Sequence, residues 1–132
     1  MQIESLNHLV LTVRDIETTV EFYVRVMGME AVTFGQGRKA LQFGQQKINL
    51  HPQGQSFEPK AQNPLLGSAD LCFVTQQPIE AIARHLNQCS VAIIEGPVSR
   101  TGAIGPIVSV YFRDPDLNLI EVCRYLSPGE KM

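Results

Sequence analysis

Four side chains of the kinds that bind divalent metals lie at two pairs of corresponding positions in the chain. They are His8 and His51 in the first half, and Asp70 and Glu121 in the second. Imidazole suits Zn, Ni, Fe and Co, and a carboxylate adds the negative charge that offsets the cation. In a repeated pattern of elements Asp70 takes the place of His8, and Glu121 takes the place of His51 when NLIE is aligned with INLH. The sequence therefore predicts one metal site with these four ligands.

Each ligand also has a plain structural alternative. Glu121 lies in the apolar run L-I-E-V, where an ionised carboxylate needs a strong partner. A metal is one such partner, but Arg113 or Arg124 could serve as well. Asp70 could instead cap a turn after Ser68. These alternatives remain open at the level of the sequence.

Cationic side chains that could bind an anionic substrate are also present. Lys47 shares the expected strand face of His51, and Arg100 lies in a glycine-rich segment, 99–106, that is well suited to closing over a cleft. We therefore expect Lys47 and Arg100 to contact substrate. Arg38 and Lys60 are further candidates, and for all four a solvated surface charge is the alternative.

The elements that must position these residues follow one order twice. The first copy has a strand over 3–13, and a helix over 16–28 that begins after Asp15 and ends at Gly28. Three short strands follow, over 29–34, 38–44 and 47–52. The second copy has, in the same order, a strand over 68–75, a helix over 79–89, and strands over 90–96, 107–114 and 119–126.

The repeat predicts an α+β fold in one domain, 1–132, made of two βαβββ modules. Module one covers about 3–55, a polar connection about 52–67, and module two about 68–126. In each module a helix covers one face of the sheet, so the other face stays bare unless the second module covers it. Pairing the modules into a curved, barrel-like mixed sheet would give a concave cleft, and concave surfaces hold ligands.

Composition excludes several classes of protein. The 132 residues are 44% hydrophobic and carry a net charge of −2, which excludes a disordered chain and makes nucleic acid an unexpected partner. No apolar run is long enough to span a membrane, and the first residues lack the pattern of a secretory signal. The three cysteines form no CxxC motif. We expect a cytoplasmic protein whose partner is a small molecule.

Two stretches of the chain resemble a known superfamily. LNHLVLTVRDIETTVEFYVRVMGME and YFRDPDLNLIEV are similar to the opening and closing motifs of the vicinal oxygen chelate superfamily, which includes glyoxalase I, bleomycin-resistance proteins and extradiol dioxygenases. KALQFGQQKINLH with FEPKAQ, SADLCFVT and EGPVSRTGAIGP resemble its branch of glyoxalase-domain-containing protein 5 and virulence-associated glyoxalase-like proteins. The resemblance implies the glyoxalase fold, a homodimer, and a divalent metal (Zn, Ni, Mn, Fe or Co) in a cleft lined by His8, His51, Asp70 and Glu121.

The resemblance also implies a type of reaction. Members bind vicinal oxygens of a substrate to the metal, so we expect a glyoxalase-like lyase or isomerase in which the metal stabilises an enolate and Glu121 removes a proton. Glyoxalase I has Glu at the position of His51 and His or Gln at that of Asp70, so lactoylglutathione lyase activity is not implied. The alternative is a non-catalytic drug-binding or metabolite-binding protein of the bleomycin-resistance type.

Overall fold

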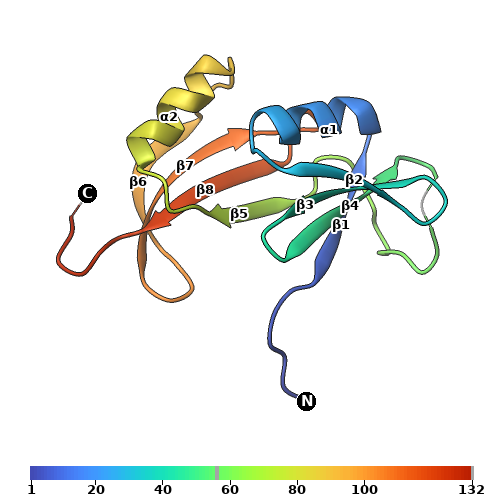
Figure 1. The fold of residues 1–132 in the computed structure, drawn as a ribbon, viewed down its shortest axis with the longest axis horizontal. Coiled ribbons are helices and arrows are strands. Elements are labelled where there is room, and N and C mark those ends of the chain that lie inside the picture. Colours follow the sequence, from blue (N-terminus) through green and yellow to red (C-terminus); the bar gives the residue numbers. More distant parts are fainter. Residues whose placement is uncertain (56, 132) are drawn as a thin grey trace. The chain divides into compact units, whose positions relative to one another are not determined.

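The computed structural model describes residues 1–55 and 57–131, which fold into two compact units (Figure 1). Unit 1 is Met1–Ser68 and unit 2 is Ala69–Met132. Each unit contains a helix and a four-stranded mixed sheet in the order strand, helix, strand, strand, strand. The expected α+β class is therefore confirmed, and both copies of the βαβββ pattern are present.

Unit 1 has its first and last strands side by side. Its elements are β1 (His8–Val13), α1 (Ile16–Arg25), β2 (Glu30–Phe34), β3 (Arg38–Phe43) and β4 (Gln46–Pro52). The strand order is β1-β4-β3-β2, with β1 parallel to β4 and the other pairs antiparallel. The parallel pair is possible because α1 and two further strands lie between β1 and β4 in the chain.

Unit 2 repeats this topology. Its elements are β5 (Asp70–Val74), α2 (Ile79–Gln88), β6 (Glu95–Thr101), β7 (Pro106–Arg113) and β8 (Leu119–Tyr125). The order is β5-β8-β7-β6, with β5 parallel to β8 and the other pairs antiparallel. The two units therefore place corresponding strands at corresponding sheet positions.

The sheet face under each helix forms the core of its unit. In β4, Ile48 and Leu50 are buried and lie on the same face, and α1 contributes the buried Phe22 and Tyr23. Each aliphatic side chain buried in this way contributes roughly 1.5–3 kcal/mol. Because successive strand residues point to opposite faces, the residues between these core positions face away from the helix. The candidate site residues lie on that second face.

The two ends of α1 are held by different means. Asp15 is the N-cap residue as expected, but its side chain makes no capping bond to a backbone N–H of the described first turn. Its Oδ2 instead accepts a hydrogen bond from the Thr18 hydroxyl at 2.6 Å. At the other end Gly28 has a φ of +69°, and the Met29 N–H bonds to the Tyr23 carbonyl. Glycine suits this left-handed position because it lacks a Cβ.

The bounds of two predicted strands are wrong. The first strand begins at His8 rather than at residue 3. The sixth strand is β6, Glu95–Thr101, rather than 90–96. The chain just after α2 is still tied to the helix, since the Val91 N–H bonds to the Leu86 carbonyl, and the ladder with β7 starts only at Glu95. Arg100 therefore lies in a strand, paired with Ile107, and not in a glycine-rich loop.

None of the helices in the described residues is long and apolar enough to cross a membrane.

Candidate functional site

The sheet face of unit 1 that points away from α1 carries three of the predicted residues. His8 pairs with Lys47 across β1 and β4, and Thr12 pairs with His51. Paired residues in a ladder share a face, so His8, Lys47 and His51 lie on one face together with Asn49. The sequence prediction that Lys47 and His51 share a face is confirmed.

The same register separates the two histidines. His8 and His51 are four positions apart along the parallel ladder, which corresponds to about 13 Å of strand. His8 is exposed, with Nδ1 2.9 Å from Asn7 Oδ1. His51 is buried at the far end of β4. Unit 1 thus brings His8 closer to Asn49 than to His51, because Asn49 is one diagonal step from it.

In unit 2 the two predicted carboxylate ligands, Asp70 and Glu121, are diagonal neighbours on the paired strands β5 and β8. Asp70 pairs with Leu119 and Cys72 pairs with Glu121, so Asp70 and Glu121 share a face, two positions apart. Diagonal neighbours of this kind have Cα atoms about 7–8 Å apart. Asp70 is exposed at the start of β5, whereas Glu121 is half-buried.

Comparison of the two registers changes the correspondence within the repeat. Because His8 pairs with Lys47 and Asp70 pairs with Leu119, the residue that corresponds to Glu121 is Asn49. The alignment of NLIE with INLH is therefore wrong by two residues. Letter similarity suggested it, but strand pairing fixes the equivalent positions.

Asn49 has a buried side-chain oxygen that is available to a ligand. It is 5% exposed, and its Oδ1 is buried with no hydrogen-bond partner in the described chain. Leaving a buried acceptor unpaired costs about 1–3 kcal/mol. Sequence reasoning missed Asn49, and only the strand pairing identifies it.

The donor types on these faces fit a divalent metal. Imidazole nitrogen, carboxylate oxygens and an unpaired amide oxygen are ligands that first-row and alkaline-earth cations accept. Over residues 1–55 and 57–131, no group of three or more His, Cys, Asp or Glu side chains lies together in a way that could hold a metal. The structure thus shows two donor pairs, His8 with Asn49 and Asp70 with Glu121, each inside its own unit.

His51 is held by contacts within unit 1. Its Nε2 lies 3.4 Å from Arg38 Nη2, and its ring meets the Phe57 ring edge-on with centroids 5.1 Å apart. Burial and, to a smaller extent, the charge of Arg38 lower the pKa of His51. The neutral imidazole is therefore favoured, which leaves one ring nitrogen as an acceptor for Arg38.

Glu121 is fixed by a hydroxyl that the sequence analysis did not single out. Ser109 Oγ donates a 2.6 Å hydrogen bond to Glu121 Oε2. Neither proposed arginine partner is used in this way: Arg124 pairs with Glu130, and Arg113 Nη1 donates to the Leu117 carbonyl. Alternation along β7 could have identified Ser109, since it shares its sheet face with Tyr111, the residue paired with Glu121.

Arg100 reaches the same face of unit 2 from β6. Its Nε donates to the Tyr111 hydroxyl at 2.9 Å, and its Nη2 lies 2.7 Å from Glu95 Oε2. Burial raises the pKa of Tyr111, and the nearby charge of Glu121 raises it further, against the opposing effect of Arg100. The predicted substrate-binding Arg100 is therefore already paired with a carboxylate.

Two thiols lie beside Glu121. Cys72 Sγ and Cys123 Sγ are 3.6 Å apart and are not joined in a disulfide. Burial, together with Cys123 and Glu121, raises the pKa of Cys72 to about 12. Both thiols are thus held in the protonated form, which disfavours a nucleophilic role.

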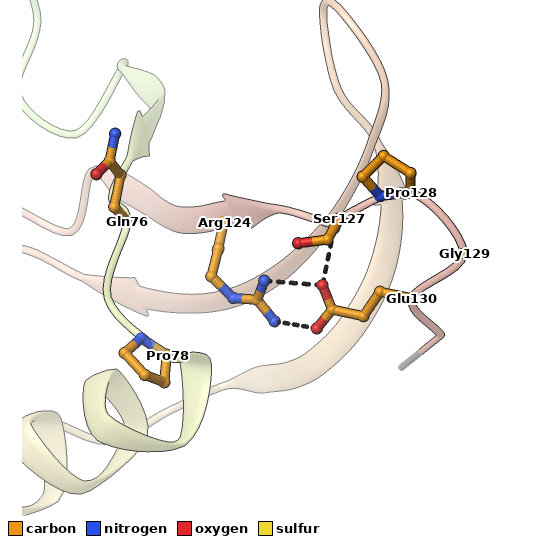
Figure 2. A pocket seen from close by; sticks show the side chains of 7 residues that line it. All are labelled: Gln76, Pro78, Arg124, Ser127, Pro128, Gly129 and Glu130. Atoms are coloured by element: carbon orange, nitrogen blue, oxygen red, sulfur yellow. Dashed lines mark hydrogen bonds and ion pairs between the residues drawn. The ribbon is translucent and has the colours of Figure 1, made fainter.

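A hollow of about 590 Å³ in unit 2 is lined by none of the predicted ligands (Figure 2). Its lining includes Gln76, Pro78 and the ion pair of Arg124 with Glu130. Figure 2 shows that both ends of the Arg124 guanidinium contact the Glu130 carboxylate. Because its cation is already neutralised, this hollow is a poor candidate for an anionic ligand.

Topology and polar faces of this kind define a glyoxalase-type α+β protein, and comparisons with known proteins agree. Residues 5–122 match the family described as the Glyoxalase/Bleomycin resistance protein/Dioxygenase superfamily. The chain belongs to this superfamily.

Close relatives carry names from the branch that the sequence resembles. The chain is 58% identical to virulence protein STM3117 of Salmonella typhimurium over 96% of its own length and 88% of the relative. It is 55% identical to the glyoxalase domain-containing protein RDO1 of Mycosarcoma maydis, over 95% of its own length and 70% of the relative. An integron cassette protein from the mobile metagenome of V. cholerae has a solved structure with 60% identity and a TM-score of 0.94, covering 96% of this chain and 98% of that one.

More distant structures share the fold alone. They include a lactoylglutathione lyase from Agrobacterium tumefaciens, with 20% identity and a TM-score of 0.72 over 93% of this chain and 95% of that one. An antibiotic-binding protein from Streptomyces has 21% identity and a TM-score of 0.74 over 96% of this chain and 99% of that one. The fold therefore hosts both a lyase and a binding protein.

Proposed function

We propose that the protein is a divalent-metal-dependent lyase or isomerase that acts on a small molecule with neighbouring oxygens. The observation that carries this proposal is the repeated donor pair: His8 with Asn49 in unit 1 and Asp70 with Glu121 in unit 2, at the same register. A repeat that keeps donor atoms at equivalent positions, one of them a buried acceptor without a partner, is expected of a ligand set. Superfamily membership supports the reaction class.

The ligands of the proposed metal are His8, Asp70 and Glu121, with a fourth donor from β4. The sequence names His51 for that position, whereas the register names Asn49. We favour Asn49, because its Oδ1 has no partner while His51 is engaged by Arg38. The four donors of one metal come either from a single chain or from both chains of a dimer. In either arrangement there is one metal for each chain.

Glu121 is the proposed proton acceptor. When bound, a divalent cation supplies Lewis-acid stabilisation of the negative charge that develops on a substrate oxygen. Ser109 holds Glu121 Oε2 and so fixes the carboxylate in one orientation. A carboxylate held in place can remove a proton from a carbon next to a carbonyl group, and such general-base catalysis contributes about 10²–10⁴-fold.

Metal content tests the ligand set. Purified protein, loaded with Zn, Ni, Mn, Fe or Co and desalted, should retain about one metal per chain by elemental analysis. Loss of a residue that only orients a metal ligand typically weakens metal affinity by about tenfold to a hundredfold. His8→Ala and Glu121→Ala each remove a proposed ligand itself, so each should weaken metal affinity by more than that. Asn49→Ala should weaken it more than His51→Ala does. Less than one metal per two chains in the wild type would favour the alternative, a non-catalytic binding protein.

Proton abstraction is tested without knowledge of the natural substrate. Small hydroxy-ketones and keto acids are incubated with metal-loaded protein in D₂O, and loss of the carbon-bound proton is followed by NMR. Glu121→Gln keeps the size of the side chain but removes the base, so exchange should fall at least about a hundredfold. Exchange that survives in Glu121→Gln would rule out the proposed role of Glu121.

A further inference from the structure

A group of cations and aromatic rings lies together on the face of unit 1 that carries Lys47 and His51. Arg38 Cζ lies 4.9 Å from the Phe34 ring centroid and 4.4 Å from that of Phe57. Lys47 Nζ lies 3.8 Å from the same Phe34 centroid. With His51, which contacts both Arg38 and Phe57, these five residues form what we term the cation-aromatic cluster.

The two charges in this cluster have no ion-pair partner among the described residues. Within the described ranges, ion pairs join Arg25 to Glu21, Lys60 to Glu58, Arg100 to Glu95 and Arg124 to Glu130. Neither Arg38 nor Lys47 is among them, although both side chains are partly buried. Two like charges beside one ring repel each other, and partial burial reduces the screening by water.

The aromatic rings hold the cations in place without neutralising them. A cation over a ring face gains about 0.5–2 kcal/mol, which offsets part of the repulsion and orders both flexible side chains. Phe34 contacts both cations, and Phe57 contacts Arg38 from the segment after β4. The N–H groups of both cations therefore remain available to an acceptor, apart from the one that Arg38 directs at His51.

We propose that the cation-aromatic cluster binds an oxyanion, the carboxylate or phosphate group of the small-molecule ligand. An oxyanion between Arg38 and Lys47 supplies the missing negative charge, and the planar guanidinium matches two oxygens of such a group. His51 supports the site by position: its Nε2 lies 3.4 Å from Arg38 Nη2, so it helps to hold the guanidinium in place. That the bound acid is the substrate rests on the proposed function, whereas the binding site itself does not.

This cluster is a better anion site than the one that includes Arg100. Both contain an arginine beside an aromatic ring, but Arg100 is paired with Glu95 at 2.7 Å. An incoming anion would have to displace that carboxylate. At Arg38 no ion-paired carboxylate of the described residues has to be displaced.

The test titrates metal-free protein with inorganic phosphate and, separately, with acetate, against sodium chloride at equal ionic strength. Binding is followed by the thermal midpoint and by the ¹⁵N NMR signal of the Arg38 side chain. At least one oxyanion should raise the midpoint more than chloride does, and should shift the Arg38 signal. Phosphate as the stronger ligand would assign a phosphoryl group, and acetate a carboxylate. The same midpoint shift with chloride would overturn the proposal.

Three single variants make the test specific. Lys47→Gln and Arg38→Gln remove one charge each, and each should weaken oxyanion binding about tenfold or more. Lys39→Gln is the matched control, because Lys39 follows Arg38 in β3, points to the opposite face and bonds to Thr33. Without ligand, Lys47→Gln should be at least as stable as the wild type, since repulsion is relieved. Equal weakening by Lys39→Gln would show a nonspecific charge effect and overturn the proposal.

The outcomes separate this inference from the proposed function. Oxyanion binding in a protein that retains no metal supports the cluster and contradicts the metal-dependent enzyme. Metal retention and proton exchange without oxyanion binding support the metal-dependent enzyme and contradict the oxyanion site in the cation-aromatic cluster. Arg38→Gln and Lys47→Gln are compared only after circular dichroism shows wild-type folding, and either one that folds suffices.

Discussion

At the scale of single residues, the polar side chains differ in how far their surroundings satisfy them. Glu121 has one oxygen held by Ser109, and His51 has Arg38. Asn49 Oδ1 has no partner in the described chain, and Arg38 has no carboxylate within ion-pair distance. Polar atoms left unsatisfied in partly or fully buried positions cost stability, so they indicate where a ligand contributes to the folded protein.

The carboxylate of Glu130 accepts three hydrogen bonds and gives a prediction about pH. Arg124 donates to both of its oxygens, at 3.1 and 2.7 Å, and the Ser127 N–H donates to Oε1 at 2.8 Å. These bonds lower the pKa of Glu130 to about 2. A carboxyl whose pKa is lowered by folding stabilises the protein above its unfolded value of about 4.5, and loses that effect as pH falls toward 2.

The expected result is a loss of thermal stability between pH 4.5 and pH 2 that depends on this residue. Glu130→Gln should lower the thermal midpoint at pH 7 and flatten the part of its decline that lies below pH 4.5. Glu58→Gln is the control, since Glu58 is exposed and 3.6 Å from its partner Lys60. Identical midpoint-against-pH curves for wild type and Glu130→Gln would contradict the prediction.

At the scale of elements, the sequence predicts the order of helices and strands along the chain well, but it predicts poorly which residues of two strands pair. Apolar alternation and glycine breaks identified both helices and the order of helices and strands along the chain, because these signals are local. Register depends on which residues of distant strands pair, and here a slip of two keeps every side chain on its face. Lys47 was therefore assigned to the correct face, while His51 was matched to Glu121 in place of Asn49. The boundary error at Arg100 has a similar origin, since the extent of β6 depends on its pairing with β7.

Pairing of β6 with β7 depends on one glycine. Gly96 has a φ of +111°, and a Cβ at this position would lie 2.5 Å from the Ser109 carbonyl oxygen. Gly96→Ala should therefore lower the free energy of unfolding by about 2–4 kcal/mol, because both the backbone conformation and the close approach are lost. Gly37→Ala isolates the conformational part: its φ is +79° and no atom lies within 4 Å, so about 1 kcal/mol is expected. Urea denaturation measures both, and equal effects would refute the contact argument.

At the scale of the whole molecule, each four-stranded sheet has two edge strands. The edge strands are β1 and β2 in unit 1, and β5 and β6 in unit 2. Edge strands present unpaired backbone groups, and proteins usually cover them or make them polar. Two of these strands instead carry exposed apolar side chains, Val10 in β1 at 46% and Val74 in β5 at 60% exposure. Exposed apolar side chains on edge strands favour association with a second chain.

We therefore predict a homodimer, with twice the mass of one chain in sedimentation velocity at micromolar concentration. Val74→Lys and Val10→Lys put a charge beside an edge strand, so each should shift the equilibrium toward monomer by tenfold or more, about 1.4 kcal/mol. Ile104→Lys is the matched control, because Ile104 is 86% exposed but lies in the turn between β6 and β7. It should leave the dimer intact, since no edge strand is altered. A wild-type monomer at these concentrations would remove the dimer from the proposed function and leave the metal ligands to a single chain.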